Sequence, residues 1–155
     1  MRIISGCWRG RKLTVADAPG LRPSGDRSRE TLFNWLQASV RGSRCADLFA
    51  GSGALGFEAA SRGAAEVVLI EQARAAARVL RQNLEMLGAE QCRVVESDAL
   101  SWLAGQEPGS LDIVFIDPPF GSGLEARALA ILNENGAVNS DGLVYVETAR
   151  GKPPL

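Results

Sequence analysis

The segment 117–120 carries the clearest chemical signal in the chain. Asp117, Pro118, Pro119 and Phe120 directly follow the apolar run 111–116. Proline fixes φ and has no N–H, so two consecutive prolines neither extend a strand ladder nor begin an ordinary helical turn. The Asp117 carboxylate and the Pro118 carbonyl therefore form two adjacent acceptors, and Phe120 adds a flat apolar face. This set matches a planar amino group on an aromatic base or an amide; the alternative is a structural, proline-rich strand exit.

A glycine-rich segment earlier in the chain has the pattern of a nucleotide-binding turn. Gly51, Gly53 and Gly56 satisfy G-x-G-x-x-G between an apolar run and a helical stretch. Such glycines allow a sharp turn and let a ligand lie against bare backbone at a helix N-terminus. Glu71 stands 20 residues after Gly51, where a carboxylate accepts the hydroxyl protons of a ribose. The pattern predicts a nucleoside cofactor and leaves NAD and S-adenosylmethionine open; the alternative is a structural turn with an exposed acid.

Asp98 and Ala99 follow another apolar run, 92–96. The Asp98 carboxylate can cap the helix that begins at Ala99. It can also accept the exocyclic amine of an adenine ring, with the Ala99 backbone N–H beside it. The residues alone leave these two interpretations open.

The chain has no histidine, which excludes several kinds of catalytic site. Ser-His-Asp and Cys-His nucleophile pairs, His-ligated zinc and an imidazole base are all ruled out. The three cysteines, Cys7, Cys45 and Cys92, are odd in number and widely spaced, which is typical of reduced thiols rather than a zinc site or disulfides. We therefore expect no bound metal, and chemistry that depends on carboxylates, backbone groups or an organic cofactor.

Length and composition indicate one soluble domain. The chain has 155 residues, of which 46% are hydrophobic and 23% charged, enough apolar material for a core. No run approaches the ~20 apolar residues that cross a bilayer, and the first residues lack the apolar core of a signal peptide. We expect a cytoplasmic protein that does not associate with membranes.

The elements that must position the candidate residues alternate along the chain from residue 45 onward. Continuous apolar strands separated by helices predict an α/β fold, a Rossmann-like, doubly wound and mostly parallel sheet covered on both faces. The expected strands are 45–50, 66–70, 92–96, 111–116 and 143–147. The expected helices are 54–62, 73–87, 99–104 and 124–133.

The beginning of the chain is basic, whereas the remainder is acidic. Residues 1–45 contain nine Lys/Arg and three Asp/Glu, and residues 46–155 contain eight and fifteen. This split predicts a basic end that meets an anionic polymer; the alternative is a lopsided solvated surface. The patterns predict a small β-hairpin with a basic tip, followed by a helix over 26–40. We expect this extension to span 1–40 and the core to span 41–155, in one compact unit.

In their order, these motifs resemble those of class I S-adenosylmethionine-dependent amino-methyltransferases. The resemblance is carried by the run from Asp47 to Gly56, then Glu71, Asp98 and Asp-Pro-Pro-Phe. It extends to the basic end, through 2–6, 8–13, 21–24 and 26–36. Over nearly its whole length the chain is similar to the bacterial 16S ribosomal RNA guanine-N2 methyltransferase family, of the RsmD type.

That resemblance implies S-adenosylmethionine as the cofactor and the N2 amine of a guanine in 16S ribosomal RNA as the acceptor, within small-subunit assembly particles. It places catalysis on Asp117, Pro118, Pro119 and Phe120. The implied cofactor-binding residues are Asp47, Phe49, Gly51, Gly53, Glu71, Asp98 and Ala99. The implied RNA-binding residues are Arg9, Arg11, Lys12, Arg22, Arg27 and Arg29; for Arg27 and Arg29 the alternative is helix-surface charge.

Rival functions use some of the same residues. Another RNA, DNA or a protein amide is an alternative amine acceptor, although the basic end favours RNA. An NAD-dependent oxidoreductase has no use for Asp-Pro-Pro-Phe and lacks a histidine acid or base. A non-catalytic RNA-binding module is the remaining alternative, and in every case we expect a monomer.

The chain departs from the family pattern at two points. Ser24 stands where the family usually has threonine, which keeps the hydroxyl. The family's sheet closes with a C-terminal β-hairpin, but only eight residues follow the expected strand 143–147. We therefore expect the closing hairpin to be missing and the fifth strand to present an unpaired edge.

Overall fold

A five-stranded sheet forms the centre of the molecule in the computed structural model, which describes residues 1–16 and 25–147. All its strands are parallel, and their order is β3-β2-β1-β4-β5. The strands are β1 (Arg44–Asp47), β2 (Glu66–Glu71), β3 (Cys92–Glu96), β4 (Leu111–Ile116) and β5 (Val138–Val146). This is the doubly wound order, in which the chain reverses direction across the sheet between β1 and β4. The predicted α/β class and the parallel sheet are confirmed.

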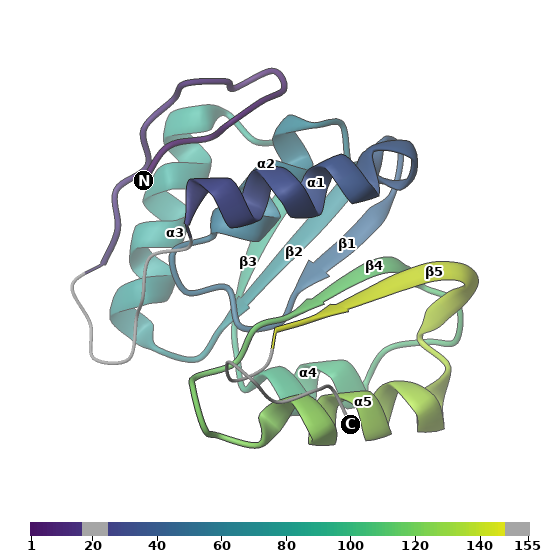
Figure 1. Cartoon of the computed structure of the whole chain (residues 1–155). Coiled ribbons are helices and arrows are strands. Elements are labelled where there is room, and N and C mark those ends of the chain that lie inside the picture. Colours follow the sequence, from purple (N-terminus) through teal and green to yellow (C-terminus); the bar gives the residue numbers. More distant parts are fainter. Residues whose placement is uncertain (17–24, 148–155) are drawn as a thin grey trace.

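Helices cover both faces of the sheet (Figure 1). One buried cluster contains Phe33, Phe57 and Leu80, and the other contains Leu103 and Leu132. The first cluster lies under α1 (Asp26–Val40), α2 (Ala54–Ser61) and α3 (Arg74–Leu87). The second lies under α4 (Ala99–Ala104) and α5 (Leu124–Asn135). Because both faces are covered, the central strands read as continuous apolar runs rather than alternating ones.

Two strands have bounds that differ by three or more residues from those expected, for local reasons. β1 ends at Asp47 rather than at residue 50, because the chain then turns and the Gly53 N–H donates to the Ala50 carbonyl. β5 begins at Val138 rather than at 143, and its pairing with β4 shifts register between Leu111 and Ile113. Within the described residues β5 pairs only with β4, so it forms an edge of this sheet.

The basic end forms a looser structure than the predicted hairpin. Residues 1–14, here called the arm, contain a single antiparallel bridge between Arg2 and Lys12 in place of two strands. The arm departs from a ladder because it turns at Gly6 to contact α2, where the Cys7 N–H donates to the Ser61 carbonyl at 2.9 Å. The predicted hairpin is present as a short antiparallel pairing, in which the Ile3 N–H donates to the Arg11 carbonyl and the Leu13 N–H to the Met1 carbonyl, but it does not extend into regular strands. No helix within residues 1–16 and 25–147 is long and apolar enough to cross a membrane.

Candidate active site

A pocket opens at the carboxyl ends of β1, β2 and β4, where the strand order reverses. This is the position at which open α/β sheets bind their ligands. Residues from the ends of four strands and the helices after them contribute to its wall. They are 47–52, 54–55, 70–73, 76, 97–99, 117–119 and 124.

The glycine loop between β1 and α2 forms one wall, but its glycines differ in role. Gly51 lines the pocket and has φ of +54°, a conformation that favours glycine. Gly53 is the residue before α2 and does not line the pocket. A Cβ at Gly53 would lie 2.6 Å from the Phe57 ring and 2.7 Å from Leu80 Cδ2. This glycine allows the loop to pack closely on Phe57 and Leu80, and its contact with the cofactor stays a prediction.

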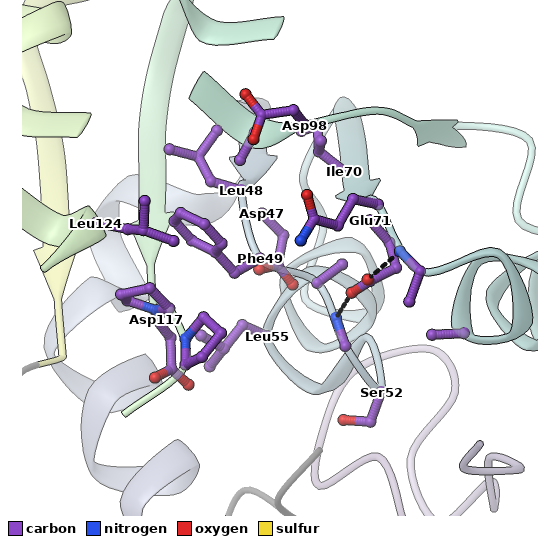
Figure 2. A pocket seen from close by; sticks show the side chains of 18 of the residues that line it. Asp47, Leu48, Phe49, Ser52, Leu55, Ile70, Glu71, Asp98, Asp117 and Leu124 are labelled. Carbon is purple, nitrogen blue, oxygen red and sulfur yellow. Dashed lines mark hydrogen bonds between the residues drawn. The ribbon is translucent and has the colours of Figure 1, made fainter. Parts of the chain in front are cut away.

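Glu71, the last residue of β2, binds the same loop through its carboxylate. Its Oε1 accepts the Gly51 N–H at 2.9 Å, and its Oε2 accepts the Ala73 N–H at 2.8 Å (Figure 2). A carboxylate has about four lone-pair sites, so two bonds leave acceptor capacity at the pocket wall. Glu71 is thus placed to accept hydroxyl protons from a ligand while it orders the turn at Gly51.

Asp47 is buried at the end of β1 and places a carboxyl group on the floor of the pocket. It is 2% exposed, and its Oδ2 accepts the Gly56 N–H at 3.0 Å. Burial is the main cause that raises the pKa of Asp47 to about 7; the bond from the Gly56 N–H opposes this rise, and the nearby Asp117 and Glu71 carboxylates add to it. Three acidic side chains around one pocket favour a ligand that carries positive charge.

Asp98 is engaged as a helix cap. Its Oδ2 accepts both the N–H and the hydroxyl of Ser101, at 2.9 and 3.0 Å, so the structural interpretation is confirmed. Asp98 and Ala99 nevertheless line the pocket, on the side formed by the end of β3. The capping bonds fix the orientation of the Asp98 carboxylate at this wall.

Asp117, Pro118 and Pro119 follow β4 and line the pocket, as expected. The Pro119 carbonyl accepts the Ser122 N–H at 3.2 Å, but no backbone N–H within residues 1–16 and 25–147 donates to the Pro118 carbonyl. Phe120 is 74% exposed and lies outside the lining residues. The structure thus places the two predicted acceptors at the pocket and leaves the aromatic ring on the adjoining surface.

Several pocket residues were not predicted. Most of them neighbour a predicted residue in sequence at a strand end, as Leu48 and Ile70 do, so extending each motif by one residue would have found them. Leu124 had no such signal, because it begins α5 and reaches the pocket only through the packing of that helix. The other unpredicted lining residues are Ala50, Ser52, Ala54, Leu55, Gln72, Ala73, Ala76 and Ser97.

The predicted RNA-binding residues divide into three groups. Arg9, Arg11, Lys12 and Arg27 are exposed, and Arg11 also donates to the Met86 carbonyl at 3.2 Å. Arg22, together with Ser24, lies outside the described residues. Arg29 forms the third group, because it is buried.

The assignment of Arg29 to RNA is corrected by its environment. Its side chain is 1% exposed, and its guanidinium lies 2.5 Å from Asp26 and 3.4 Å from Glu58. It also donates to the Arg2 carbonyl at 3.0 Å. Arg29 lies on the face of α1 that carries Leu32 and Leu36 toward the core, and the two carboxylates compensate its buried charge. Arg29 is therefore a structural residue.

The chain matches known proteins over nearly its full length. A family model described as "Conserved hypothetical protein 95" matches residues 1–154. The chain is 53% identical, over 148 residues, to ribosomal RNA small subunit methyltransferase D of Escherichia coli K12, covering 96% of this chain and 74% of that protein. It is 47% identical, over 156 aligned positions, to the protein of the same name from Haemophilus influenzae, covering 99% and 81%.

A solved structure agrees with these sequence matches. "Putative methyltransferase yhhF from Escherichia coli" superposes with a TM-score of 0.88 at 49% identity, covering all of this chain and 85% of the other. Its likeness extends the agreement from the motifs to the whole sheet and its helices. The chain therefore belongs to the ribosomal RNA small subunit methyltransferase D family, a group of enzymes with the Rossmann-like fold of class I methyltransferases.

Proposed function

We propose that this protein transfers a methyl group from S-adenosylmethionine to the exocyclic N2 amine of a guanine in 16S ribosomal RNA. The names of the relatives support small-subunit ribosomal RNA as the substrate. The observation that carries the proposal is the presence of Asp117 and Pro118 in the same pocket as Gly51 and Glu71. This arrangement brings an acceptor pair for an amino group to a nucleoside-binding loop.

The residues of the pocket fit such a cofactor. S-adenosylmethionine, when bound, supplies a methyl group activated by the positive charge of its sulfonium sulfur. The acidic pocket favours a ligand with that charge, and Asp47 is assigned to the ammonium group of its methionine portion. Gly51 and Phe49 border the methionine portion, Glu71 accepts the ribose hydroxyls, and the Ala99 N–H and Asp98 contact the adenine.

Two acceptors activate the guanine amine. The lone pair of N2 is shared with the ring, so the amine is a poor nucleophile in its planar form. The Asp117 carboxylate and the Pro118 carbonyl accept its two N–H groups, which draws the nitrogen toward tetrahedral geometry and directs the lone pair at the methyl group. As the C–N bond forms and the C–S bond breaks, the nitrogen becomes acidic and a proton passes to Asp117. Positioning supplies most of the rate acceleration, so no histidine base is required.

The basic end is assigned to the RNA. The exposed Arg9, Arg11, Lys12 and Arg27 contact phosphates, and the target base leaves its stack to enter the pocket. Phe120, exposed beside Asp117, stacks on that base and sets its plane. In this arrangement residues 1–40 form the RNA side and the chain from residue 41 onward forms the cofactor-binding core of a monomeric, cytoplasmic enzyme that acts on small-subunit assembly particles.

Replacement of Asp117 tests the proposal. Asp117→Ala is expected to lose methyl transfer from labelled cofactor into 16S RNA, supplied naked or in small-subunit particles. Its thermal shift with S-adenosylhomocysteine stays close to that of the unmodified protein. Asp141→Ala, which removes an exposed acid on β5, serves as the control and keeps full turnover. Near-normal turnover by Asp117→Ala would refute this mechanism.

The same assays separate the rival functions. Stabilisation by NAD but not by S-adenosylhomocysteine would indicate an oxidoreductase. Methyl transfer to DNA or to a protein amide, but not to RNA, would replace the substrate and keep the chemistry. RNA binding with no methyl transfer under any condition would indicate a binding module.

A further inference from the structure

One face of α3 carries three arginines that the proposed function has not yet used. Arg74, Arg78 and Arg81 are spaced by four and three residues, which places them on the same side of the helix. All three are exposed, and they border a surface groove together with Gln82, Leu84, Glu85 and Glu96. We call Arg74, Arg78 and Arg81 the α3 arginine face.

Most of the charge of this face is uncompensated. Arg81 lies 3.6 Å from Glu96, but neither Arg74 nor Arg78 takes part in an ion pair with any residue of 1–16 or 25–147. The described part of the acidic body, 46–147, contains only six Lys/Arg, and three of them belong to this face. Positive charge is therefore concentrated at one place on a body that is otherwise acidic.

The arm is attached directly to α3, on the side of the helix that carries Asn83 and Met86. The Thr14 N–H donates to Asn83 Oδ1 at 3.1 Å, and Asn83 Nδ2 donates to the Thr14 carbonyl at 2.8 Å. Arg11 donates to the Met86 carbonyl in the last turn of α3. Figure 1 shows the arm, in purple, beside the teal α3. Asn83 lies half a turn around α3 from Arg74, so the arm is attached to a different flank of the helix from the α3 arginine face.

The opposite end of α3 begins at the cofactor pocket. Ala73, the residue before α3, lines the pocket and donates to Glu71. From Arg74 to Met86 the helix rises about 18 Å, at about 1.5 Å per residue. The α3 arginine face therefore begins at the rim of the pocket and runs along the helix to whose other end the arm is attached.

We propose that the α3 arginine face binds the phosphate backbone of the RNA substrate as it passes from the arm to the pocket; this inference rests on the proposed function. Guanidinium groups bind phosphate oxygens with two parallel N–H bonds, which a row of exposed arginines can repeat along a strand. Each phosphate contact releases condensed counterions, so the contribution of this face weakens with salt. The contacts carry no base specificity and set the path and register of the RNA.

Charge reversal on α3 tests this surface. Arg78→Glu and the double variant Arg74→Glu/Arg78→Glu are compared with Arg127→Glu, which changes an exposed arginine on α5, across the sheet from α3. The dissociation constant for 16S RNA is measured over a salt series. We expect the double variant to bind about tenfold more weakly than the control and the salt slope to fall by about one for each arginine removed. Affinity for S-adenosylhomocysteine and the melting temperature are expected to stay unchanged.

The outcomes distinguish this inference from the function on which it rests. Equal RNA affinity and salt slope in the double variant and in Arg127→Glu would overturn the RNA surface on α3 while the unmodified protein still methylates RNA. If the unmodified protein neither binds nor methylates RNA, both proposals fail. Arg78→Gln, which removes charge without reversing it, covers the case in which the double variant does not fold. By itself, Arg78→Gln is expected to lower the salt slope by about one.

Discussion

Arg29 and Glu58 form a buried ion pair, with Arg29 Nη1 3.4 Å from Glu58 Oε1 and exposures of 1% and 0%. The same Glu58 carboxylate accepts the backbone N–H groups of Ile4 and Ser5, at 2.9 and 3.1 Å. Arg62 Nε donates to its other oxygen at 2.8 Å. One carboxylate on α2 thus joins α1, α2 and the arm, so the arm and the cofactor loop that precedes α2 share a buried attachment.

Removal of Glu58 is expected to destabilise the fold strongly. Glu58→Ala leaves the buried Arg29 with only the exposed Asp26 as an acidic partner. It also leaves two backbone N–H groups of the arm without their hydrogen-bond acceptor. Loss of one partner of a buried pair costs about 3–5 kcal/mol, which denaturant unfolding measures directly. The matched control is Glu30→Ala, an exposed acid on α1, expected to stay within about 0.5 kcal/mol of the unmodified protein. Equal, small losses in both variants would contradict the attachment.

Two glycines of the arm provide a second test. Gly6 and Gly10 both have positive φ, of +85° and +80°. A Cβ at Gly6 would lie 2.0 Å from the Ser61 carbonyl oxygen, whereas one at Gly10 meets no heavy atom within 4 Å. Gly10→Ala is expected to lose about 1–2 kcal/mol of stability, from the backbone strain of a side chain at positive φ alone. Gly6→Ala is expected to lose more stability, because its Cβ would also clash with the Ser61 carbonyl, and this clash is expected to detach the arm from α2.

Trypsin reports that detachment, because the arm contains Arg9, Arg11 and Lys12. Faster cleavage of the arm is expected in Gly6→Ala than in Gly10→Ala under native conditions. Identical cleavage rates would show that the contact with Ser61 does not hold the arm in place.

The contribution of Asp47 to the stability of the fold is expected to fall as pH rises from about 4 to 7. Burial raises the pKa of Asp47 to about 7, whereas an unfolded aspartate has a pKa of about 3.9. Across this interval the folded protein keeps a proton that the unfolded chain has released, so the contribution of Asp47 to the free energy of unfolding falls and then levels above pH 7. In Asp47→Asn this contribution is absent. The difference in free energy of unfolding between the two proteins, measured from pH 4 to 8, should change across the interval; a constant difference would contradict the raised pKa.

The layered fold and much of the pocket could be predicted because their signals are local. Hydrophobic periodicity reports which sides of a segment are buried, so runs such as 66–70 and 111–116 predicted strands of a covered sheet. The carboxyl ends of parallel strands meet at one edge of the sheet, so the sequence predicts Gly51, Glu71 and Asp117 in one pocket, where the structure places them.

Tertiary packing decided what local pattern could not. Arg29 has the sequence context of an exposed basic residue, but it is buried, and Glu58, 29 residues away, is buried opposite it and compensates its charge. The arm bends away from a regular hairpin for a similar reason, since Ser61 and Asn83 on other helices accept its backbone N–H groups. Leu124 reaches the pocket through the packing of α5 alone.

The amino-acid sequence by itself therefore determined the order of strands and helices, the motifs at the strand ends and the family. The partners of the buried charges, the course of the arm and its attachment to α3 came only from the folded chain. The physical reason is that periodicity and turn preferences act over a few residues. The burial of a charge depends instead on a compensating group that the chain brings close from a distance.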